Sequence, residues 1–418
     1  MKSKLVLLTS KIGSGITPRG GSSVYVDKGT YLIRSQNIYN DHFEKDGLVC
    51  IVDETAEKMK GVTVCKNDVL INITGDSVAR TFIVPNEFLP ARVNQHVCIL
   101  RTKPNLNPFY LYYFLIEPTT QNLLLNLSGS GGTRKALTKE MLEELEIELP
   151  SIQSQQKIIF PLVIIKLQIE NLQKQNKILE KITQSIFKSW FIDFDGQTEF
   201  VDSELGQIPK GWKISSLSLD MSIIHGYAFK GEFFSDTKTN NILLTPGNFA
   251  IGGGFKGDKM KYYEGPIPEK YILSEGDLLV SMTDLSKMAD TLGFPALIPK
   301  HDSRLFLHNQ RLGKIKINSE SYLTKEFLYI LFCGSDYRNE ILASASGTTV
   351  KHTSPERILS HKFVLPDEDT LKKFQILVEP IFNNIDSNSS TISILSKIRD
   401  SLLPKLMSGE IRVPICVT

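Results

Sequence analysis

The sequence predicts two copies of an α/β (α+β) domain, joined by two long helices that pair as an antiparallel coiled coil. Three observations predict this fold class. The chain has 418 residues, which is long for one hydrophobic core, so two or more domains are expected. Its two halves resemble each other at a fixed offset. A seven-residue apolar spacing, which is typical of a coiled coil, follows each half's mixed segment.

The repeat is clearest around two prolines. The segments ELEIELP and HKFVLP end at Pro150 and Pro366, which lie 216 residues apart. The same offset then aligns the apolar positions that follow, without a gap. Before the prolines the match is looser but ordered: NDVLINIT (67–74) corresponds to GDLLVSMT (276–283), and NQHVCILR (94–101) to NQRLGKIK (309–316). Because self-similarity at a fixed period indicates duplication, we expect two copies related by a pseudo-twofold axis.

Each copy consists of a mixed α/β segment followed by a helical segment. Short β-branched runs between turns rich in Gly, Asn, Asp and Pro indicate strands, and helical patches among them make the segment mixed α/β. A long helical segment follows. The predicted divisions are a first domain at 1–150, a first helix at 151–192, a linker at 193–211, a second domain at 212–366 and a second helix at 367–410.

Apolar residues recur every seven positions in both helical segments. The predicted seam consists of Ile165, Leu172, Leu179 and Ile186 in the first helix and Ile381, Leu395 and Leu402 in the second, with Ile182 and Ile398 among the intervening positions. Asn176 and Asn388 are polar at seam positions, where such residues fix register at some cost in stability. An amphipathic helix lying on its own domain is the alternative. The matched length of the two stripes favours pairing of the helices.

Composition excludes several classes of protein. Net charge is +2 with a pI near 8.1, whereas dedicated nucleic-acid-binding domains often have a pI above about 9, so charge alone decides nothing. Five cysteines and seven histidines are scattered, which argues against disulfides and a metal site and for a reducing cytoplasm. No apolar run reaches the roughly 18 residues of a membrane helix, and no signal-peptide cleavage site is evident. We therefore expect a cytoplasmic protein.

No catalytic constellation emerges from the sequence. Asn107-Pro108-Phe109-Tyr110 is similar to the N-P-P-[FY] motif that grips a target adenine, but one proline is missing. An N-cap at Asn107 with Pro108 as the first helical residue is the simpler interpretation. The glycine runs at 129–132 and 252–254 form no G-x-x-x-x-G-K-[ST] phosphate loop, so they are interpreted as turns or as loops near DNA.

At this point a family resemblance emerges. SWFIDFDG followed by SELGQIPKGW, between a heptad helix and a new domain, resembles the central junction of type I restriction-modification specificity subunits. SGITPRGG (14–21) and HGYAFKGEFF (225–234) resemble the openings of their target recognition domains, and ISILSKIRDSLLPKLMSGEI resembles their carboxy-terminal helix. Nearly the whole chain is covered in the family's order. The P-x-x-E-Q entry to the first helix is missing, because this chain has PSIQSQQKI there.

The resemblance implies a non-catalytic subunit. Each α/β domain would read one half of a bipartite duplex DNA site, and the helices would set the gap between the halves. Two DNA-methylating subunits would dock on the coiled coil, and restriction subunits would be able to join them. The resemblance implies no cofactor in this chain: S-adenosylmethionine and ATP would be bound by the partner subunits.

Candidate DNA-binding residues follow from the chemistry of base recognition. Arg and Lys suit guanine, Asn and Gln suit adenine, and hydroxyls suit phosphate. Positions shared by both copies, such as Asn94-Gln95 and Asn309-Gln310, are expected to serve the scaffold. The remaining candidates are Thr17, Arg19, Arg34, Ser35, Asn37, Arg80, Arg92, Arg134 and Lys135 in the first copy, and Tyr227, Lys230, Asn248, Lys256, Ser286, Lys287, Arg311 and Lys351 in the second. For each single position, a solvated surface charge remains the competing interpretation.

Two other classes of function stay open at this stage. A self-sufficient DNA methyltransferase or nuclease would need donor-binding and catalytic motifs, which the sequence does not display. A structural dimerisation protein would use the coiled coil without DNA, but two large domains rich in loops argue against a mere spacer.

Overall fold

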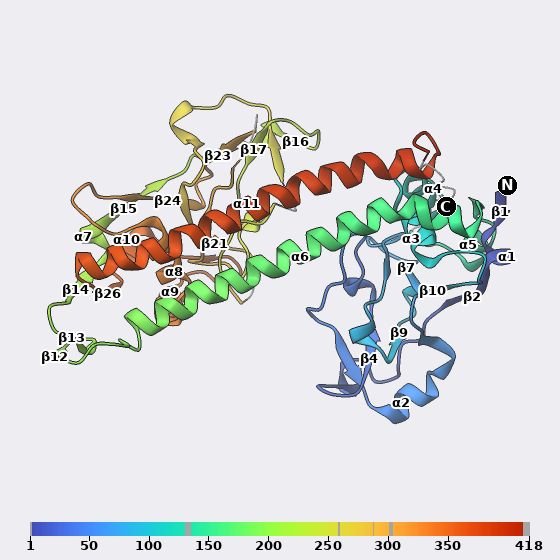
Figure 1. The fold of residues 1–418 in the computed structure, drawn as a ribbon, viewed down its shortest axis with the longest axis horizontal. Coiled ribbons are helices and arrows are strands. Elements are labelled where there is room, and N and C mark those ends of the chain that lie inside the picture. The colour runs from blue at the N-terminus through green and yellow to red at the C-terminus, as the bar shows by residue number, and fades with distance from the viewer. Residues whose placement is uncertain (1, 130–134, 258–259, 287, 301–303, 413–418) are drawn as a thin grey trace, which may run out of the picture. The chain divides into compact units, whose positions relative to one another are not determined.

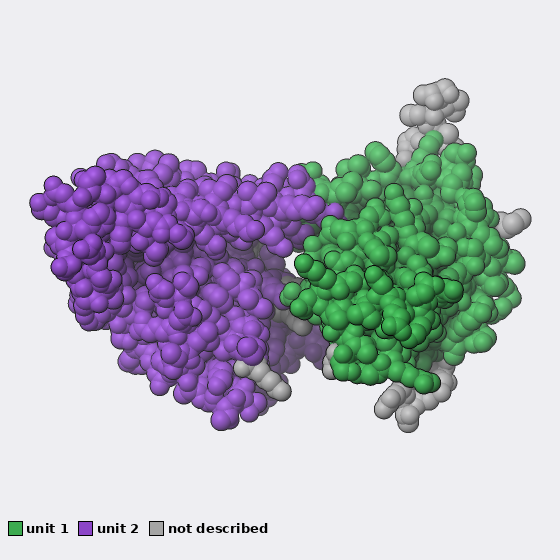
Figure 2. Space-filling model, turned by 90° about the horizontal axis from the view of Figure 1, so that it is seen from below, with its two compact units in different colours: residues 1–169, 394–418 green, residues 170–393 purple. Residues whose placement is uncertain are grey.

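The computed structural model describes residues 2–129, 135–257, 260–286, 288–300 and 304–412. The chain divides into two compact units, coloured separately in Figure 2. Unit 1 comprises residues 1–169 and 394–418, and unit 2 comprises residues 170–393. The boundaries predicted from the sequence lie at the helix ends, whereas the compact units divide both long helices. The reason is that part of each helix is buried in each unit's hydrophobic core.

The first domain, within unit 1, contains three sheets (Figure 1). Their strand orders are β3-β5-β4-β9-β6, β2-β10-β7-β8 and β1-β11. The strands are β1 (Lys2–Lys4), β2 (Thr9–Ser14), β3 (Tyr25–Val26), β4 (Thr30–Ile33), β5 (Val49–Ile51), β6 (Thr63–Val64), β7 (Val69–Asn72), β8 (Thr81–Ile83), β9 (Ala91–Val93), β10 (Val97–Thr102) and β11 (Glu146–Glu148). The helices are α1 (Leu5–Leu8), α2 (Asp53–Lys58), α3 (Pro108–Ile116), α4 (Pro118–Gly129) and α5 (Lys139–Glu143), with short 3-10 turns η1 (Gly21–Val24), η2 (Ser35–Asn37), η3 (Lys60–Val62) and η4 (Asn86–Phe88).

The second domain, within unit 2, repeats these orders as β16-β18-β17-β23-β19, β15-β24-β20-β22 and β14-β26, and adds the pairs β12-β13 and β21-β25. Its strands are β12 (Phe200–Ser203), β13 (Gly206–Pro209), β14 (Lys213–Ser216), β15 (Met221–His225), β16 (Phe234–Ser235), β17 (Asn241–Leu243), β18 (Lys261–Tyr263), β19 (Ile272–Leu273), β20 (Leu278–Ser281), β21 (Thr283–Asp284), β22 (Pro295–Leu297), β23 (Leu305–Leu307), β24 (Leu312–Ile317), β25 (Lys351–His352) and β26 (Lys362–Leu365). Its helices are α7 (Leu217–Asp220), α8 (Lys325–Cys333), α9 (Ser335–Ser344) and α10 (Pro355–Leu359), with η5 (Gly231–Phe233), η6 (Pro246–Asn248) and η7 (Glu269–Tyr271).

The repeat predicted from the sequence is therefore a repeat of topology. In each domain one strand pair of the five-stranded sheet is parallel, β4 with β9 and β17 with β23, while the other pairs are antiparallel. In each four-stranded sheet an inner strand is buried at every residue, β7 in the first domain and β20 in the second. Strands covered on both faces have such continuous apolar runs, which explains VLIN and LLVS in the sequence.

Two long helices follow the domains: α6 (Ile152–Phe191) and α11 (Glu368–Met407). They pair in an antiparallel manner within each unit. In unit 1, Leu162 of α6 and Leu403 near the end of α11 belong to one buried core. In unit 2, Asn176 contacts Asn388, and Phe191 at the end of α6 stacks against Phe374 near the start of α11. The expected antiparallel coiled coil is thus present.

The seam agrees with the predicted heptad positions and differs at two of the intervening ones. Leu172 is buried, and the other predicted seam residues, Ile165, Leu179, Ile186, Ile381, Leu395 and Leu402, are half-buried. Ile182 and Ile398, however, are each 42% exposed. Thr183 is buried in place of Ile182, and Arg399 is half-buried in place of Ile398. The inner positions therefore follow Leu179 and Leu395 by four residues rather than three.

The predicted linker at 193–211 is ordered. It forms a hairpin of β12 and β13, and its ends join an aromatic cluster. The cluster combines the end of α6, the segment after the hairpin, α8 and the start of α11, and its members are Phe187, Phe191, Phe194, Trp212, Phe327 and Phe374. The Trp212 indole N–H donates to the Asp367 carboxylate over 2.9 Å. The opening of the second domain is thereby fixed to both long helices.

Candidate nucleic-acid interface

Each domain brings three loops together at one edge of its four-stranded sheet. In the first domain, Ile73 donates its backbone N–H to His96 and accepts from the N–H of Leu137. In the second domain, Met282 makes the same two bonds, with Arg311 and Thr353. These loops, 73–80, 94–96 and 135–137 in the first domain and 282–286, 288–294, 309–311 and 351–353 in the second, are called the loop edge below.

The turns of both loop edges are closed by an equivalent backbone bond. The strand before the turn ends at Asn72 or Ser281, and the chain returns at Ala79 or Gly293, whose N–H donates to the carbonyl of that residue. Ala79 and Gly293 both have positive φ, 69° and 80°. A non-glycine residue rarely adopts this left-handed conformation, which surrounding contacts must hold in place. The bonds of Ala79 fix the direction in which the next residue, Arg80, leaves the turn.

In the first domain the loop edge borders an open cleft of about 450 Å³. It is lined by Ser35, Gln36, Tyr39, Thr74, Gly75, Asp76, Ser77, Arg80 and His96. The Arg80 guanidinium carbon lies over the Tyr39 ring, 4.4 Å from the ring centroid. The His42 ring also stacks on Tyr39, with 4.6 Å between the two ring centroids. Stacking restrains a long side chain and leaves the edge of the guanidinium fork for a bidentate acceptor. The cleft thus holds donors and acceptors of both kinds that base edges require.

A histidine lies in a different segment of each loop edge. Thr74 bonds to the His96 Nδ1 atom at 2.6 Å in the first domain, whereas its counterpart Thr283 bonds to the His352 Nδ1 atom at 3.1 Å in the second. Arg311 stands where the first domain has His96, because both accept the same backbone bond. Equivalent edges therefore present different side chains, as two readers of different sequences require.

The structure places most first-copy candidates at the surface. Thr17, Arg19 and Lys135 are exposed, and Lys135 belongs to the loop edge, where its carbonyl accepts from Gly75. Ser35 and Arg80 line the cleft together. Arg34 turns away, since its guanidinium packs over Tyr25 and donates to the Gly47 carbonyl. Of the predicted DNA-binding residues of the first copy, only Ser35 and Arg80 therefore line the cleft.

Second-copy candidates divide in a similar way. Tyr227, Lys230, Lys256 and Arg311 are exposed, and Lys351 and Ser286 are half-buried. Tyr227 follows Gly226, where an added Cβ would lie 2.2 Å from the Asn309 carbonyl oxygen. Only glycine allows this approach. Gly15 meets Val93 and Asn94 in the same way, so Ile16 and Tyr227 are equivalent surface positions beside the loop edges.

Three predicted DNA-binding residues are structural, which corrects the sequence interpretation. Asn37 and Asn248 are fully buried and close η2 and η6 in the same manner. Each amide accepts from a backbone N–H three residues earlier and donates to a carbonyl, of Glu44 or Lys256. Arg92 is buried and donates to the Ala56 carbonyl over 3.0 Å. Because these groups are consumed inside the domain, they do not face a duplex. Arg134 and Lys287 lie outside the described residues.

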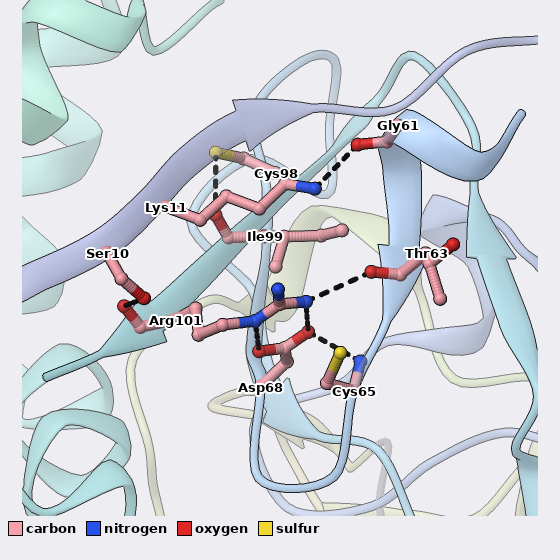
Figure 3. A network of polar contacts seen from close by, with 9 residues as sticks. All are labelled: Ser10, Lys11, Gly61, Thr63, Cys65, Asp68, Cys98, Ile99 and Arg101. Atoms are coloured by element: carbon pink, nitrogen blue, oxygen red, sulfur yellow. Dashed lines mark hydrogen bonds and ion pairs between the residues drawn. The ribbon is translucent and has the colours of Figure 1, made fainter.

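A buried ion pair supports the sheet behind the first loop edge (Figure 3). The Arg101 guanidinium contacts both oxygens of the Asp68 carboxylate at 2.8 Å, and that side chain is 1% exposed. The hydrogen bond to Asp68 raises the pKa of Arg101. Asp277 is the counterpart of Asp68, and its partner is Lys314 at 2.6 Å. The network holds β6, β7 and β10 together and is a scaffold feature.

The two shared asparagines serve the scaffold as expected, whereas Gln95 and Gln310 are exposed. Asn94 and Asn309 each accept, through the side-chain oxygen, from the backbone N–H two residues later. Asn107 likewise proves to be a helix cap, because its side chain accepts from Phe109 and Tyr110 and Pro108 begins α3. Thr324 caps α8 in the same place. The adenine-gripping interpretation of this segment is therefore excluded by geometry.

Sequence reasoning missed several residues of the cleft and of the loop edges. Tyr39, Gln36 and His96 line the cleft, and His352 bonds to Thr283. The available signal was the position of His96 directly after the shared Asn94-Gln95, where the second copy has Arg311. Among the described residues, no group of three or more His, Cys, Asp or Glu side chains is arranged to hold a metal ion. Within the same part of the chain, no helix is long and apolar enough to cross a membrane.

The fold and the loop edges are those of a recognition protein. Its two domains have the same strand orders but present different side chains at their loop edges. A family model described as the type I restriction modification DNA specificity domain matches residues 12–182. The type I restriction enzyme MjaIX specificity subunit of Methanocaldococcus jannaschii is 32% identical over 342 residues, covering 78% of this chain and 74% of the relative. The HindI specificity subunit of Haemophilus influenzae is 23% identical over 456 residues, covering 91% and 94%.

Solved structures agree on the fold. The type I restriction-modification S subunit of M. genitalium superposes with a TM-score of 0.54 at 14% identity, covering 97% of this chain and 95% of that one. The chain therefore belongs to the family of type I restriction enzyme specificity subunits, whose role is DNA recognition.

Proposed function

We propose that this chain is the DNA-sequence-specificity subunit of a type I restriction-modification complex and that it recognises a bipartite duplex site. Each α/β domain reads one half of the site through its loop edge. The observation that carries this proposal is the pair of loop edges, which share equivalent backbone hydrogen bonds but present different side chains. A repeated scaffold with unlike reading residues suits two unlike half-sites.

The paired helices set the number of unread base pairs between the half-sites. They also dock two methylase subunits, one for each copy of the repeat. The support comes from apolar residues that the helices leave exposed at equivalent positions, 216 residues apart. Phe160 and Ile376 are 65% and 72% exposed, Ile178 and Ile394 are 58% and 56% exposed, and Ile182 and Ile398 are 42% exposed each.

Such a duplicated pattern favours two copies of one partner. Single exposed apolar residues are ordinary, but a set repeated at matched exposure on polar helices indicates a surface that is covered in an assembly. A partner that recognises one set recognises the other as well. Restriction subunits join the complex through the methylases or beside them.

We further propose that this chain binds no cofactor and catalyses no reaction. S-adenosylmethionine is bound by the methylase partners and ATP by the restriction partners, and the complex acts in the cytoplasm. Support comes from the reassignment of Asn107 to a helix cap, which removes the one segment of the chain that resembles a methylase motif. Methyl transfer to DNA by the purified chain alone, without a partner protein, would contradict this part of the proposal.

The recognition proposal is tested by reading the methylated motif. Genomic DNA from cells that express this chain with its methylase is sequenced for methyladenine. We expect one motif with two specific halves and a gap of fixed length. A continuous motif, or methylation that does not depend on this chain, would refute the proposal that the chain recognises two half-sites.

The docking proposal is tested by the mass of the assembled complex. Ile178→Asp and Ile394→Asp each place a carboxylate in one of the two exposed sets, which disfavours an apolar contact. Native mass spectrometry should show one methylase lost in each single variant and both lost in the double variant. Leu219→Asp is the matched control, since Leu219 is 72% exposed and lies on α7 rather than on a long helix. Two bound methylases in the double variant would exclude this surface.

A further inference from the structure

The loop between β21 and Gly293 of the second domain displays two apolar side chains to solvent. Leu285 is 64% exposed and Met288 is 77% exposed, while Ala289 and Leu292 of the same loop are buried. The corresponding loop of the first domain, 75–78, is shorter and places Asp76 and Ser77 in the polar cleft. The same place in the fold is thus polar in one domain and apolar in the other.

Hydrogen bonds hold several of the described residues of this loop. The buried Asp284 carboxylate accepts from the backbone N–H groups of Ser286 and Thr291 and, at 2.6 Å, from the Thr291 hydroxyl. Burial alone would raise the pKa of Asp284, but the bonds from Thr291 and Ser286 lower it below its usual value. The Arg338 guanidinium donates to the Ala289 carbonyl from outside the loop. Neighbours of Leu285 and Met288, namely Ser286 and Ala289, are therefore held by hydrogen bonds.

Cationic and polar side chains flank the two apolar ones. The pairing of β21 with β25 sets Asp284 opposite Lys351 and Thr283 opposite His352. Arg311 accepts the backbone bond from Met282, two residues before Asp284. This surrounding charge suits contact with phosphates. An apolar pair inside a cationic edge of a DNA-reading domain requires an apolar group on the DNA.

Base edges offer one such group. The thymine 5-methyl group lies in the major groove, where each base pair has its own donor and acceptor pattern, whereas the minor groove presents mainly acceptors. In the first domain the equivalent loop carries Asp76, exposed in the cleft beside Arg80. A carboxylate suits the cytosine amino group of the major groove. Equivalent loops of a repeated scaffold enter the same groove.

We propose that Leu285 and Met288 contact thymine methyl groups in the major groove of the half-site that the second domain reads. This inference rests on the proposed function, namely that each domain reads one half of a duplex site. It assigns the second half-site at least one A·T pair at a fixed position, and it makes the loop a determinant of specificity.

The test removes one methyl group at a time. Once the methylated motif is known, duplexes are made in which single thymines of the second half-site are replaced by uracil, which lacks only the methyl. Binding of the complex of this chain with its methylase is measured by titration. We expect one or two positions at which uracil weakens binding by about fourfold each, the usual effect of losing one buried methyl.

Variants then assign the effect to the loop. In the Leu285→Ser/Met288→Ser double variant, the preference for thymine over uracil should disappear at those positions. Leu285→Met/Met288→Leu keeps an apolar contact and should retain the preference. Leu219→Ser changes an exposed leucine elsewhere in the domain and should also retain it. Thermal melting of each variant checks that the domain stays folded.

The outcomes are separable. A second half-site without an A·T pair, or equal affinity for thymine and uracil at every position of a half-site that is recognised, overturns the inference. A preference that persists in the double variant overturns it as well, because another residue then contacts the methyl. Failure of the wild-type complex to bind any specific duplex instead contradicts the proposed function.

Discussion

The Asn388 side-chain amide donates to the Asn176 side-chain oxygen across the two long helices, over 2.8 Å. The Asn176 amide in turn donates to Ser389 and to the Ile385 carbonyl. Both asparagines occupy seam positions at which apolar residues would pack. A polar pair there bonds only when the helices are aligned in this register, so it selects the register at some cost in stability.

We expect the two asparagines to be coupled. Asn388→Leu leaves the Asn176 side-chain oxygen without its donor, which should lower the free energy of unfolding by about 1–3 kcal/mol. Asn176→Leu/Asn388→Leu removes both polar groups and should recover that loss or exceed it. Chemical denaturation of the two single variants and the double variant completes the cycle. Asn384→Leu, at an exposed position of α11, is the control and should change little; additive single effects would show that the pair is uncoupled.

Arg80 should matter for one half-site only. Arg80→Ala removes the guanidinium from the cleft of the first domain and should weaken binding by about 1–3 kcal/mol if it contacts a base edge. Tyr39→Ala keeps the charge but removes the stacking ring, so a smaller loss is expected. Binding is measured on duplexes with one half-site mutated at a time. Lys58→Ala, on the exposed face of α2, is the control for general charge, and an equal loss at both half-sites would assign Arg80 to phosphate affinity or folding.

His308 should make the second domain sensitive to mild acid. Burial lowers its pKa to about 4 from an ordinary 6.5, and its ring N–H donates to the Leu312 carbonyl over 2.9 Å. Above pH 6.5 the folded and unfolded states both hold neutral histidine, so stability is complete. As pH falls from 6.5 to 4 only the unfolded state takes up the proton, which should cost up to about 3 kcal/mol.

The histidine effect is isolated by comparison with His308→Gln, which retains an N–H donor but does not titrate. Thermal unfolding of both proteins is followed from pH 7.5 to pH 4. The stability difference between them should change across this window. Parallel curves would show that another group governs the acid response.

The length of the paired helices should set the gap in the DNA motif. Seven residues inserted after Lys174 and seven after Ser390, which face each other on the same side of the asparagine pair, preserve the heptad phase. The helices lengthen by about 10 Å, which corresponds to roughly three base pairs. The methylated motif of an active double insertion should widen accordingly. Insertion into α6 alone is the control and should disrupt assembly, while an unchanged gap in the double insertion would mean that the helices are not the ruler.

The helices and the repeat were predictable because their signals are local. Heptad spacing, the cap at Asn107 and the shared strand segments need only sequence neighbours. Two intervening seam positions were predicted wrongly, and at one of them the reason is that a rule that ranks isoleucine above threonine selects Ile182 over Thr183. The ordered hairpin at 200–209 was missed as well, since its residues resemble a polar linker.

The loop edges were only partly predictable, and for a different reason. Asn37 and Asn248 look like adenine readers in sequence, yet their roles depend on carbonyls of Glu44 and Lys256, several residues away. The cleft likewise depends on Tyr39 and Arg80, which meet only in the folded domain. Residue chemistry suggests which groups can contact DNA, but tertiary hydrogen bonds decide which of them are free to do so.

The aromatic cluster at the end of α6 also limits how such a protein can acquire a new specificity by recombination. Phe327 and Trp212 belong to the second domain, whereas Phe191 and Phe374 belong to the helices, and their rings pack together. A crossover that imports a foreign domain with a small residue at position 327 would leave a cavity and cost about 3–5 kcal/mol. Exchange of the loop edge alone leaves this packing intact. A recombinant chain with a new DNA specificity therefore loses least stability when the breakpoints lie inside the domain and leave the aromatic cluster intact.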